Sequence, residues 1–280
     1  GYTPGEDGTP YQHTDKADEA SGVHCQLLNP IEETHIPRYL NDARFCLQEK
    51  FDGHRMLIRK QGVVIEAINR KGLIIGVPCG LLEDIATIPG DIILDGESIG
   101  DDYFAFDVLE FKGADMRSFP YRDRLCILNR LKLTRFHYLH VVETAIDAAS
   151  KAKFLSHFHK SKREGVVFKN LDAHYVAGRP ASGGDQLKYK FYATASFLVD
   201  RIHPEKRSVS LKLLSGENSI PVGSVTIPPN KPIPSEGSIV EVRYLYAYPN
   251  GSIYQPVFLH QRNDIPVDAC QHNQLKFKAA

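Results

Sequence analysis

The sequence is poor in cysteine, and its few cysteines are scattered. Five cysteines occur in 280 residues, and none of them forms a CxxC pair. A disulfide framework needs paired cysteines, and structural zinc sites usually take ligands from closely spaced Cys or His pairs. The sequence therefore favours neither, and we expect a reduced compartment and no tightly held metal.

Long apolar runs and an excess of charge of one sign are also absent. A membrane-spanning helix needs about 20 consecutive apolar residues, and no run approaches that length. Lysine and arginine total 34, aspartate and glutamate total 34, and the formal net charge is zero. These absences exclude a membrane partner and an overall cationic coat, but they allow a local basic face.

The remaining composition is typical of a globular protein. Hydrophobic residues make up 42% and charged residues 24% of the chain. A length of 280 residues suits one large or two modest domains. The sequence begins at Gly1 rather than Met, which leaves open a processed form and a removed export signal.

Three segments differ in pattern. Residues 1–22 are rich in Gly, Pro, Thr and acidic residues and predict a flexible tail or linker. Residues 23–193 predict an α+β domain, with strands and helices at 56–60, 63–68, 91–94, 103–111, 121–133 (helix), 145–159 (helix), 166–169 and 187–191. Residues 194–280 predict five strands, at 197–202, 208–214, 223–227, 239–246 and 252–258. Five strands in so short a segment favour a small all-β barrel, with an OB-fold as the leading candidate.

Seven short segments in a fixed order carry the functional signal. The first, EKFDGHR at 49–55, also suits a solvated strand edge when it is taken alone. The others are NRKG at 69–72, LDGE at 94–97, FAFDVL at 104–109, EGVVFK at 164–169, LKYK at 187–190 and FLHQRND at 258–264.

In this order the segments resemble the nucleotidyltransferase motifs of ATP-dependent DNA ligases, which are KxDGxR, SRxG, DGE, an FD strand, EGxxxK, LKxK and a final RxDK. The resemblance covers roughly residues 25–270. It implies a nucleotidyltransferase (adenylation) domain of antiparallel sheets with flanking helices at 23–193, followed by an OB-fold at 194–280.

The resemblance also implies an activity. A minimal ligase of this family seals nicks with 3′-OH and 5′-phosphate ends in duplex DNA, through a covalent lysyl-AMP intermediate and an adenylated DNA 5′ end. It implies ATP as co-substrate, Mg²⁺ or Mn²⁺ as the metal, nicked duplex DNA as the partner, and a monomer. If the chain is bacterial, we expect a cytoplasmic, nucleoid-associated protein.

Lysine chemistry fits the first motif. An amine is nucleophilic only when it is neutral, and the ordinary lysine pKa is about 10.4. Burial beside other cations lowers that pKa. The motifs bring Lys50 together with Arg55, Arg70, Lys188 and Lys190. The same cations would neutralise a triphosphate as pyrophosphate leaves.

Four matched positions concern the nucleophile and the nucleoside. The resemblance makes Lys50 the catalytic nucleophile and Gln48 the reader of adenine, a task that an amide can perform. Glu97 matches the acid that reaches the ribose. Phe106 matches the aromatic residue that stacks on adenine, although a strand phenylalanine is more often part of the core.

Six further matched positions are charged. By the resemblance, Arg55 and Arg70 contact the nucleotide and the nick phosphate. Lys188 and Lys190 contact the α-phosphate. Asp52 and Glu164 bind the divalent metal, directly or through water.

The final motif departs from the family pattern. Arg262 and Asp264 fit RxD, and Cys270 falls where the family often has a cysteine. Ile265 stands where the family usually has lysine. One cation that orients pyrophosphate is therefore missing, which puts the efficiency of adenylation in doubt rather than its nature.

A basic region lies between the motifs. Residues 112–163 contain twelve Lys and Arg against four Asp and Glu, a local excess of eight. Such an excess in a neutral protein predicts a surface that tracks phosphates. The twelve cations are Lys112, Arg117, Arg122, Arg124, Arg130, Lys132, Arg135, Lys151, Lys153, Lys160, Lys162 and Arg163.

Two alternatives use other chemistry or another substrate. An RNA ligase or an mRNA-capping guanylyltransferase would use the same lysine, and the choice between ATP and GTP would identify the latter. A non-catalytic OB-type nucleic-acid binder would form no covalent AMP adduct, although the intact KxDGxR motif argues against that reading.

Overall fold

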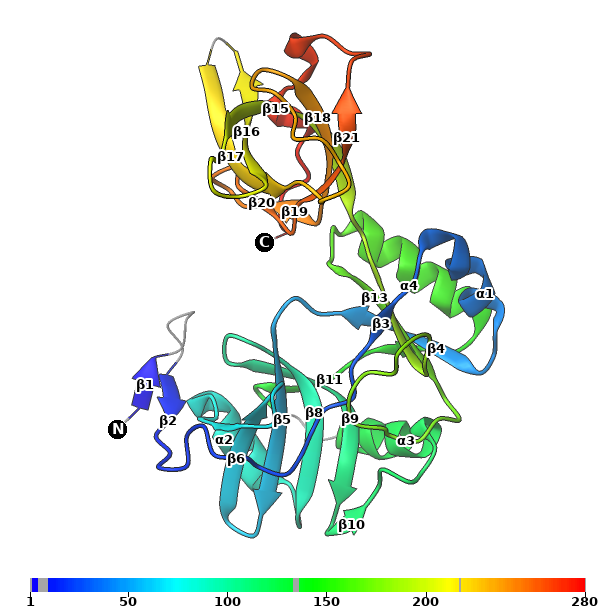
Figure 1. Cartoon of the computed structure of the whole chain (residues 1–280). Helices are drawn as coiled ribbons and strands as arrows, with labels where there is room; N and C mark the ends of the chain where they lie inside the picture. The colour runs from blue at the N-terminus through cyan, green and yellow to red at the C-terminus, as the bar shows by residue number, and fades with distance from the viewer. Residues whose placement is uncertain (1, 5–9, 133–135, 217, 280) are drawn as a thin grey trace. The chain divides into compact units, whose positions relative to one another are not determined.

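The computed structural model (Figure 1) describes residues 2–4, 10–132, 136–216 and 218–279. By its internal contacts the chain divides into two compact units. The larger unit comprises Gly1–Phe158 and Gly165–Tyr189, and the smaller comprises His159–Glu164 and Lys190–Ala280. The predicted boundary after residue 193 falls within the first long strand of the smaller unit, β15 (Ala193–Ile202).

The first sheet of the larger unit has the strand order β10-β9-β8-β5-β6-β7, and β11 pairs with β9 in parallel. Its strands are β5 (His54–Gln61), β6 (Val64–Asn69), β7 (Ile74–Ile75), β8 (Ile92–Ile99), β9 (Asp102–Phe111), β10 (Ala114–Asp115) and β11 (Leu139–Val141). The predicted hairpin between β5 and β6 is confirmed, because Gln61 pairs with Val64 and Gly62 adopts a φ of +57°. Glycine tolerates that left-handed conformation, which tight hairpin turns require.

The second sheet of the larger unit has the order β12-β4-β13-β14-β3. Its strands are β3 (Asn29–Pro30), β4 (Phe45–Lys50), β12 (Thr144–Ala145), β13 (Gly165–Asn170) and β14 (Gln186–Lys190). Strand β4 pairs with β13 in antiparallel register, so Lys50 lies opposite Gly165. Two motifs of the sequence, at 49–55 and 164–169, are thereby placed side by side.

In the described part of the chain, four α-helices accompany these sheets: α1 (Ile36–Asn41), α2 (Cys79–Thr87), α3 (Tyr121–Leu131) and α4 (Ala148–Lys160). Helix α3 begins after Pro120 and buries Leu125, Leu128 and Leu131, as the spacing predicts. The last residue predicted for it, position 133, lies outside the described residues. Helix α4 starts later than predicted, because Asp147 accepts the backbone N–H of Ser150 at 2.9 Å and caps its first turn.

Helices α1 and α2 have no counterpart in the sequence-based predictions. Helix α2 is nevertheless part of the core of the larger unit, where Leu81 and Ile85 are fully buried against Leu94 and Leu128. At nine residues it presents too short a periodic pattern to stand out from a strand.

The first 22 residues, for which the sequence predicts a tail or linker, contain ordered contacts in their described part. Strands β1 (Tyr2–Pro4) and β2 (Pro10–Gln12) pair with each other. The backbone N–H of Gln12 donates to the carbonyl of Val77 at 2.8 Å. The ammonium of Lys16 lies 2.9 Å from Glu66 on β6, which also binds Arg59. These contacts attach the segment to the larger unit.

The smaller unit contains a five-stranded antiparallel sheet of order β17-β16-β15-β18-β21. Besides β15, its strands are β16 (Ser208–Ser215), β17 (Asn218–Thr226), β18 (Ile239–Tyr244) and β21 (Val257–Arg262). A separate antiparallel pair is formed by β19 (Tyr246–Ala247) and β20 (Ile253–Tyr254). Short 3₁₀ helices occur at Val267–Ala269 and His272–Gln274 in the smaller unit, and at Glu33–His35 in the larger unit. The fifth predicted strand, at 252–258, is divided between β20 and β21. In the described residues the hydrogen-bonded path runs from β17 to β21 without closing into a ring, so an OB-fold remains a proposal.

None of the helices in the described part of the chain combines the length and apolar character needed to cross a membrane.

Candidate active site

Lys50 is the last residue of β4 and is half-buried. Its Nζ donates to the carbonyl oxygen of Phe51 at 3.4 Å. The chain then turns through Gly53 into β5. A Cβ at position 53 would lie 2.4 Å from the carbonyl oxygen of Ser98 on β8, so only glycine allows the turn to approach β8 this closely. The glycine of the first motif thus allows the segment after Lys50 to pack closely against the first sheet.

A small cavity of about 40 Å³ adjoins Lys50. Five of the predicted residues contribute to its walls, together with residues from β13 and β14. The lining residues are Leu28, Gln48, Glu49, Lys50, Phe51, Arg55, Glu97, Phe106, Val167, Lys169 and Gln186. Motifs that are far apart in the sequence therefore meet at one place, between the two sheets of the larger unit.

Two cations approach the ring of Phe106, on β9. The guanidinium carbon of Arg55 is 4.6 Å and the ammonium of Lys169 is 4.3 Å from the centre of its ring. Both distances lie within the range of a cation–π interaction. Phe106 thus differs from an ordinary core phenylalanine, because it lines a cavity and its ring contacts two cations.

Lys169 is the lysine of the EGVVFK segment, and the sequence assigns it no role. It is almost fully buried, and its Nζ donates to the carbonyl of Phe106 at 3.0 Å and lies 3.4 Å from the Tyr121 hydroxyl. Burial lowers the pKa of Lys169 to about 8. The signal that could have found it is the alternation of β13, which places residue 169 on the same face as Val167, another residue of the cavity wall.

Arg55 is held mainly by the protein itself. Its Nε and Nη2 donate to the two carboxylate oxygens of Asp95, each at 2.7 Å, and Nη2 also reaches the carbonyl of Gln26 at 3.1 Å. Tyr175 donates to the same carboxylate at 2.7 Å. Burial opposes ionisation of the guanidinium, yet the fully buried charge of Asp95 raises the pKa of Arg55 above its usual value. Asp95 thus fixes the Arg55 guanidinium over Phe106.

Gln48, on β4, is buried with its amide nitrogen in use. Nε2 donates to the Tyr121 hydroxyl at 2.9 Å and to the Thr144 hydroxyl at 2.8 Å. Tyr121 in turn donates to the carbonyl of Phe106 at 2.7 Å. This network orients the amide so that Oε1 is the atom suited to accept a hydrogen bond from a base amino group.

Two predicted cations of the larger unit, Arg70 and Lys188, do not line the small cavity. Arg70 is exposed on the turn after β6, where its carbonyl accepts the thiol of Cys25 at 3.6 Å. Lys188 lies on β14, two residues after Gln186, so both side chains belong to the same face of that strand. Since Gln186 contributes to the cavity wall, the alternation directs Lys188 toward the same side.

Glu164 and Lys190 form an ion pair in the smaller unit. The ammonium of Lys190 lies 2.7 Å from a carboxylate oxygen of Glu164, whose side chain is only 3% exposed. Lys190 also donates to the side chain of Gln255 at 3.1 Å. One predicted metal ligand is thus paired with one predicted phosphate ligand.

Arg262 ends β21 in a network of its own. It donates to Asp264 at 3.0 and 2.6 Å, to the Ser196 hydroxyl at 3.0 Å, and to Glu241 at 3.3 Å. The hydrogen bonds from Arg262 lower the pKa of Asp264 to about 2. Ile265, in place of the usual lysine, packs against the core of the smaller unit, and Cys270 is fully buried in that core.

The donors for a divalent metal are few. Within the residues that the structure describes, no group of three or more His, Cys, Asp or Glu side chains is arranged to hold a metal ion. Asp52, between Lys50 and Gly53, is half-buried.

The basic region is smaller than the sequence count suggests. Arg124 and Lys151 are each 1% exposed and therefore do not face solvent. Lys151 donates to the carbonyls of Tyr39, Asp42 and Phe45 at 3.0, 2.8 and 2.9 Å, which ties α4 to α1 and β4. Arg135 lies outside the described residues. The exposed members are Lys112, Arg117, Arg122, Arg130, Lys132, Lys153, Lys160, Lys162 and Arg163.

Comparison with known proteins gives a family. The family model described as RNA ligase matches residues 43–190, more than half of the chain. That stretch includes the lysine motif, the LKYK segment and every residue of the small cavity wall except Leu28. The chain therefore belongs to the RNA ligase family.

The relatives are ligases. A probable DNA ligase of Kineococcus radiotolerans is 37% identical over 97 residues, which is 35% of this chain and 18% of that protein. The chain thus matches less than a fifth of the length of this relative. In the structural comparison, a Lig E DNA ligase aligns with a TM-score of 0.64 at 20% identity, covering 86% of this chain and 99% of that one. A mycobacterial DNA ligase D complexed with ATP and MES aligns with a TM-score of 0.53 at 19% identity, covering 93% of this chain and 100% of that one. These two structures establish the fold.

Proposed function

We propose that this protein is an ATP-dependent polynucleotide ligase that seals nicks in duplex DNA. The observation that carries the proposal is the cavity beside Lys50, where Gln48, Glu97 and Phe106 line the walls. An amine nucleophile, an amide, a carboxylate and an aromatic ring are the groups that the transfer of an adenylyl group requires. The DNA ligases in the comparisons, including one complexed with ATP, support this reading.

The chemistry consists of three displacements at phosphorus. The neutral amine of Lys50 attacks the α-phosphate of ATP, forms a P–N bond, loses a proton and releases pyrophosphate. An oxygen of the DNA 5′-phosphate then attacks the AMP phosphorus, and the lysine leaves as it regains a proton. The 3′-OH finally attacks the adenylated 5′-phosphate, loses its proton and expels AMP, which closes the phosphodiester. Positioning and charge neutralisation carry most of the rate in such reactions.

The side chains around Lys50 suit the nucleoside. Phe106 offers a ring for stacking on adenine, and Arg55 and Lys169 hold that ring in place. Gln48 presents Oε1 to the adenine amino group, and Glu97 takes the ribose. The cavity of about 40 Å³ is smaller than ordinary ligand pockets of roughly 300–1,000 Å³, so the binding of ATP requires its walls to move apart.

The cations suit the phosphates. Lys188 and Lys190 are proposed at the α-phosphate, Arg70 at the nick phosphate, and Arg55 beside the nucleotide. Two nitrogens of the Arg55 guanidinium are already engaged by the carboxylate of Asp95. Arg55 is therefore proposed to act mainly through its contact with the Phe106 ring.

The residues present fit Mg²⁺ or Mn²⁺ bound mainly by phosphate oxygens and water. Mg²⁺ commonly uses only one or two protein carboxylates together with substrate phosphates. Asp52 would provide one carboxylate, and Glu164 would act through water or after exchange of its pairing with Lys190. The metal would neutralise charge on the phosphates.

The smaller unit is proposed to be the OB-fold domain. Its five-stranded antiparallel sheet and buried core fit that fold. Arg262 would orient the pyrophosphate during adenylation.

One observation favours a second substrate. The matching family model is described as RNA ligase, and an RNA ligase would use the same lysine. A sealing assay with matched DNA and RNA nicks at one salt concentration separates the two. Faster reaction of RNA nicks or of single-stranded ends would favour RNA, and a covalent GMP adduct in place of AMP would favour a capping guanylyltransferase.

The covalent adduct is the decisive test. Incubation with ATP and Mg²⁺ should increase the mass of the protein by one AMP, and Lys50→Ala should abolish both the adduct and nick sealing. A matched control is Lys71→Ala, an exposed lysine on the turn after β6. Labelling of Lys50→Ala at the level of the unmodified protein would contradict the assignment.

A further inference from the structure

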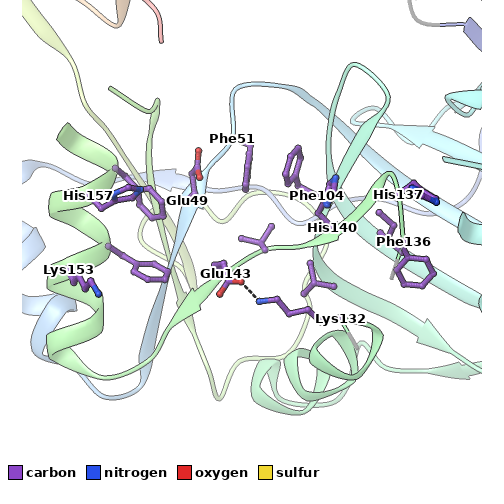
Figure 2. A pocket seen from close by; sticks show the side chains of 15 residues that line it. Glu49, Phe51, Phe104, Lys132, Phe136, His137, His140, Glu143, Lys153 and His157 are labelled. Carbon is purple, nitrogen blue, oxygen red and sulfur yellow. Dashed lines mark hydrogen bonds and ion pairs between the residues drawn. The ribbon is translucent and has the colours of Figure 1, made fainter. Parts of the chain in front are cut away.

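A second and much larger cavity lies in the larger unit, beside Phe51, the residue that follows Lys50 (Figure 2). Its volume is about 1150 Å³, and it shares Glu49 and Phe51 with the small cavity beside Lys50. Pockets that bind small ligands usually measure roughly 300–1,000 Å³. The proposed ligase chemistry leaves this cavity without a role.

One wall is a row of three aromatic rings. The rings of Phe51 and Phe104 are stacked, with centroids 4.2 Å apart and planes 19° apart. His140, on β11, continues the row at 5.1 Å from Phe104 and is held by a 2.7 Å contact between its Nε2 and Asp102. Phe104 thus covers one face of Phe51 and supports it.

The opposite wall is helix α4. Phe154 and Phe158 meet edge to face with centroids 5.4 Å apart, and His157 lies beside Phe158 at 5.6 Å. Figure 2 shows Phe104 on one side of Phe51, with Glu49 and His157 on the other. A planar group entering there would have an aromatic wall on each side, which is how proteins hold an unstacked nucleobase.

The charges of the lining favour a base over a polyphosphate. Two lysines, Lys132 and Lys153, are balanced by Glu49 and Glu143, and Lys132 is paired with Glu143. Carboxylates repel phosphate but accept hydrogen bonds from the amino groups of bases. This lining is therefore unsuited to bind a second triphosphate.

The floor of the cavity is fixed by the fold. Asp84 on α2 accepts the backbone N–H groups of His137, Tyr138 and Leu139 at 3.1, 2.5 and 2.9 Å. These bonds hold the chain leading into β11, which carries His140 and Val141 into the lining. The aromatic row is consequently supported from β9 and β11 as well as from Lys50's own segment.

We propose that this cavity binds one unpaired nucleotide of the polynucleotide substrate, with its base between Phe51 and helix α4. The inference rests on the proposed ligase function and extends it to substrates with a frayed, mismatched or single-stranded end. Because Phe51 directly follows Lys50, such a base would be held close to the residue that carries AMP.

The test uses the full chain and a set of nicked duplexes in which one nucleotide beside the nick is paired, mismatched or abasic. Binding is measured by fluorescence anisotropy for the unmodified protein and for Phe154→Leu, Phe154→Tyr and Phe119→Ala. Phe119 is an exposed aromatic residue outside the cavity lining and serves as the control. Formation of the AMP adduct is recorded for each variant, and thermal unfolding confirms that each is folded.

We expect Phe154→Leu to weaken binding of the mismatched substrate by about 5- to 150-fold, the range found for loss of one base–aromatic contact. Phe154→Tyr should restore binding because it keeps the ring, and Phe119→Ala should have no effect. The abasic substrate should bind the unmodified protein and Phe154→Leu equally well.

An equal loss on mismatched and abasic substrates would overturn the inference, as would unchanged binding of Phe154→Leu to every substrate. Competition by free AMP at the concentration of the oligonucleotide would assign the cavity to a free nucleotide instead. If the AMP adduct forms normally in all variants while Phe154 has no effect, the further inference fails and the proposed function stands. Absence of the adduct from the unmodified protein would contradict the proposed function itself.

Discussion

Phe106 shows how individual residues shape the candidate site. Two cations approach its ring, and each is held by different groups: Arg55 by the buried carboxylate of Asp95, and Lys169 by the carbonyl of Phe106 and the hydroxyl of Tyr121. A buried charge is costly unless it is paired. Lys169 has no carboxylate within ion-pair distance in the described residues, so its charge is the less well compensated of the two.

Lys169→Met should therefore stabilise the protein at neutral pH while impairing formation of the AMP adduct. The pKa of Lys169 is about 8 in the folded protein, against about 10.4 in an unfolded chain. Below pH 8 the folded state must bury the charged form, at a cost of roughly 3 kcal/mol. As the pH rises from about 8 to about 10.4, the folded protein loses this proton first and the cost disappears.

Urea unfolding at several pH values measures this effect. The gain in unfolding free energy from Lys169→Met should be largest below pH 8 and should shrink toward pH 10. Lys112→Met is a suitable control, because Lys112 is exposed and lies 5.5 Å from the Phe111 ring. A gain that does not vary with pH would show that Lys169 is not buried as a charge.

At the scale of secondary-structure elements, α3 is attached to the first sheet by more than its leucines. Arg124 donates to Asp107 on β9 at 2.7 and 3.1 Å, and both side chains are 1% exposed. Arg124 also reaches the carbonyls of Phe119 and Ala173. The helix and the strand that carries Phe106 are thereby joined by a buried ion pair.

Arg124→Met should lower the unfolding free energy by about 3–5 kcal/mol, because it leaves the Asp107 carboxylate buried and unpaired. Arg122→Ala is the matched control on the same helix. Arg122 pairs with Asp172 at the surface, where both side chains are about half exposed, and such pairs contribute at most about 1 kcal/mol. Denaturant midpoints of the two variants give the comparison; equal losses would mean that burial of the Arg124 pair has no energetic consequence.

At the scale of the whole molecule, the net charge of zero conceals an uneven distribution. Nine of the twelve cations in residues 112–163 are exposed in the described structure. Arg117, Arg122 and Lys132 are paired with Asp115, Asp172 and Glu143, respectively, which reduces their availability to phosphate. Binding of nucleic acid would therefore rely on the others and on the motif cations.

Binding to nicked duplex DNA should weaken steeply with salt. If roughly 6–10 phosphates are contacted, the affinity should fall by about 10³–10⁵-fold between 50 and 200 mM salt. Titrations at several salt concentrations measure the slope, and Arg130→Ala with Lys153→Ala should make it shallower. A response that is flat from the start would exclude the basic region as the contact surface.

Arg262→Ala should impair formation of the AMP adduct far more than sealing of a nick that already carries AMP. Arg262 belongs to the smaller unit, where Asp264 and Glu241 hold it at the end of β21. The resemblance to ligases predicts that this unit acts in the first step and releases the nucleotide site afterwards. Single-turnover assays of the two steps measure the difference, and equal losses in both would contradict the prediction.

The order of motifs in the sequence was sufficient to predict the family and the mixed α and β content of the larger unit, whereas the role of Lys50 as nucleophile stays a prediction. It also named Gln48, Glu97 and Phe106, which the structure brings to one cavity wall. For the first motif this succeeds because its turn has a strict local requirement, as the Cβ clash at Gly53 illustrates.

Only the tertiary structure decided which charged residues are available. In the sequence, Arg124 and Lys151 look like the other cations of the basic region, yet both are buried on inner helix faces because their partners lie far away in the chain, at Asp107 and at three carbonyls of residues 39–45. Lys169 gained its place over Phe106 in the same way, through the pairing of β13 with β4. A charge is buried or exposed according to the long-range partners that compensate for its lost hydration, and local sequence patterns do not contain that information.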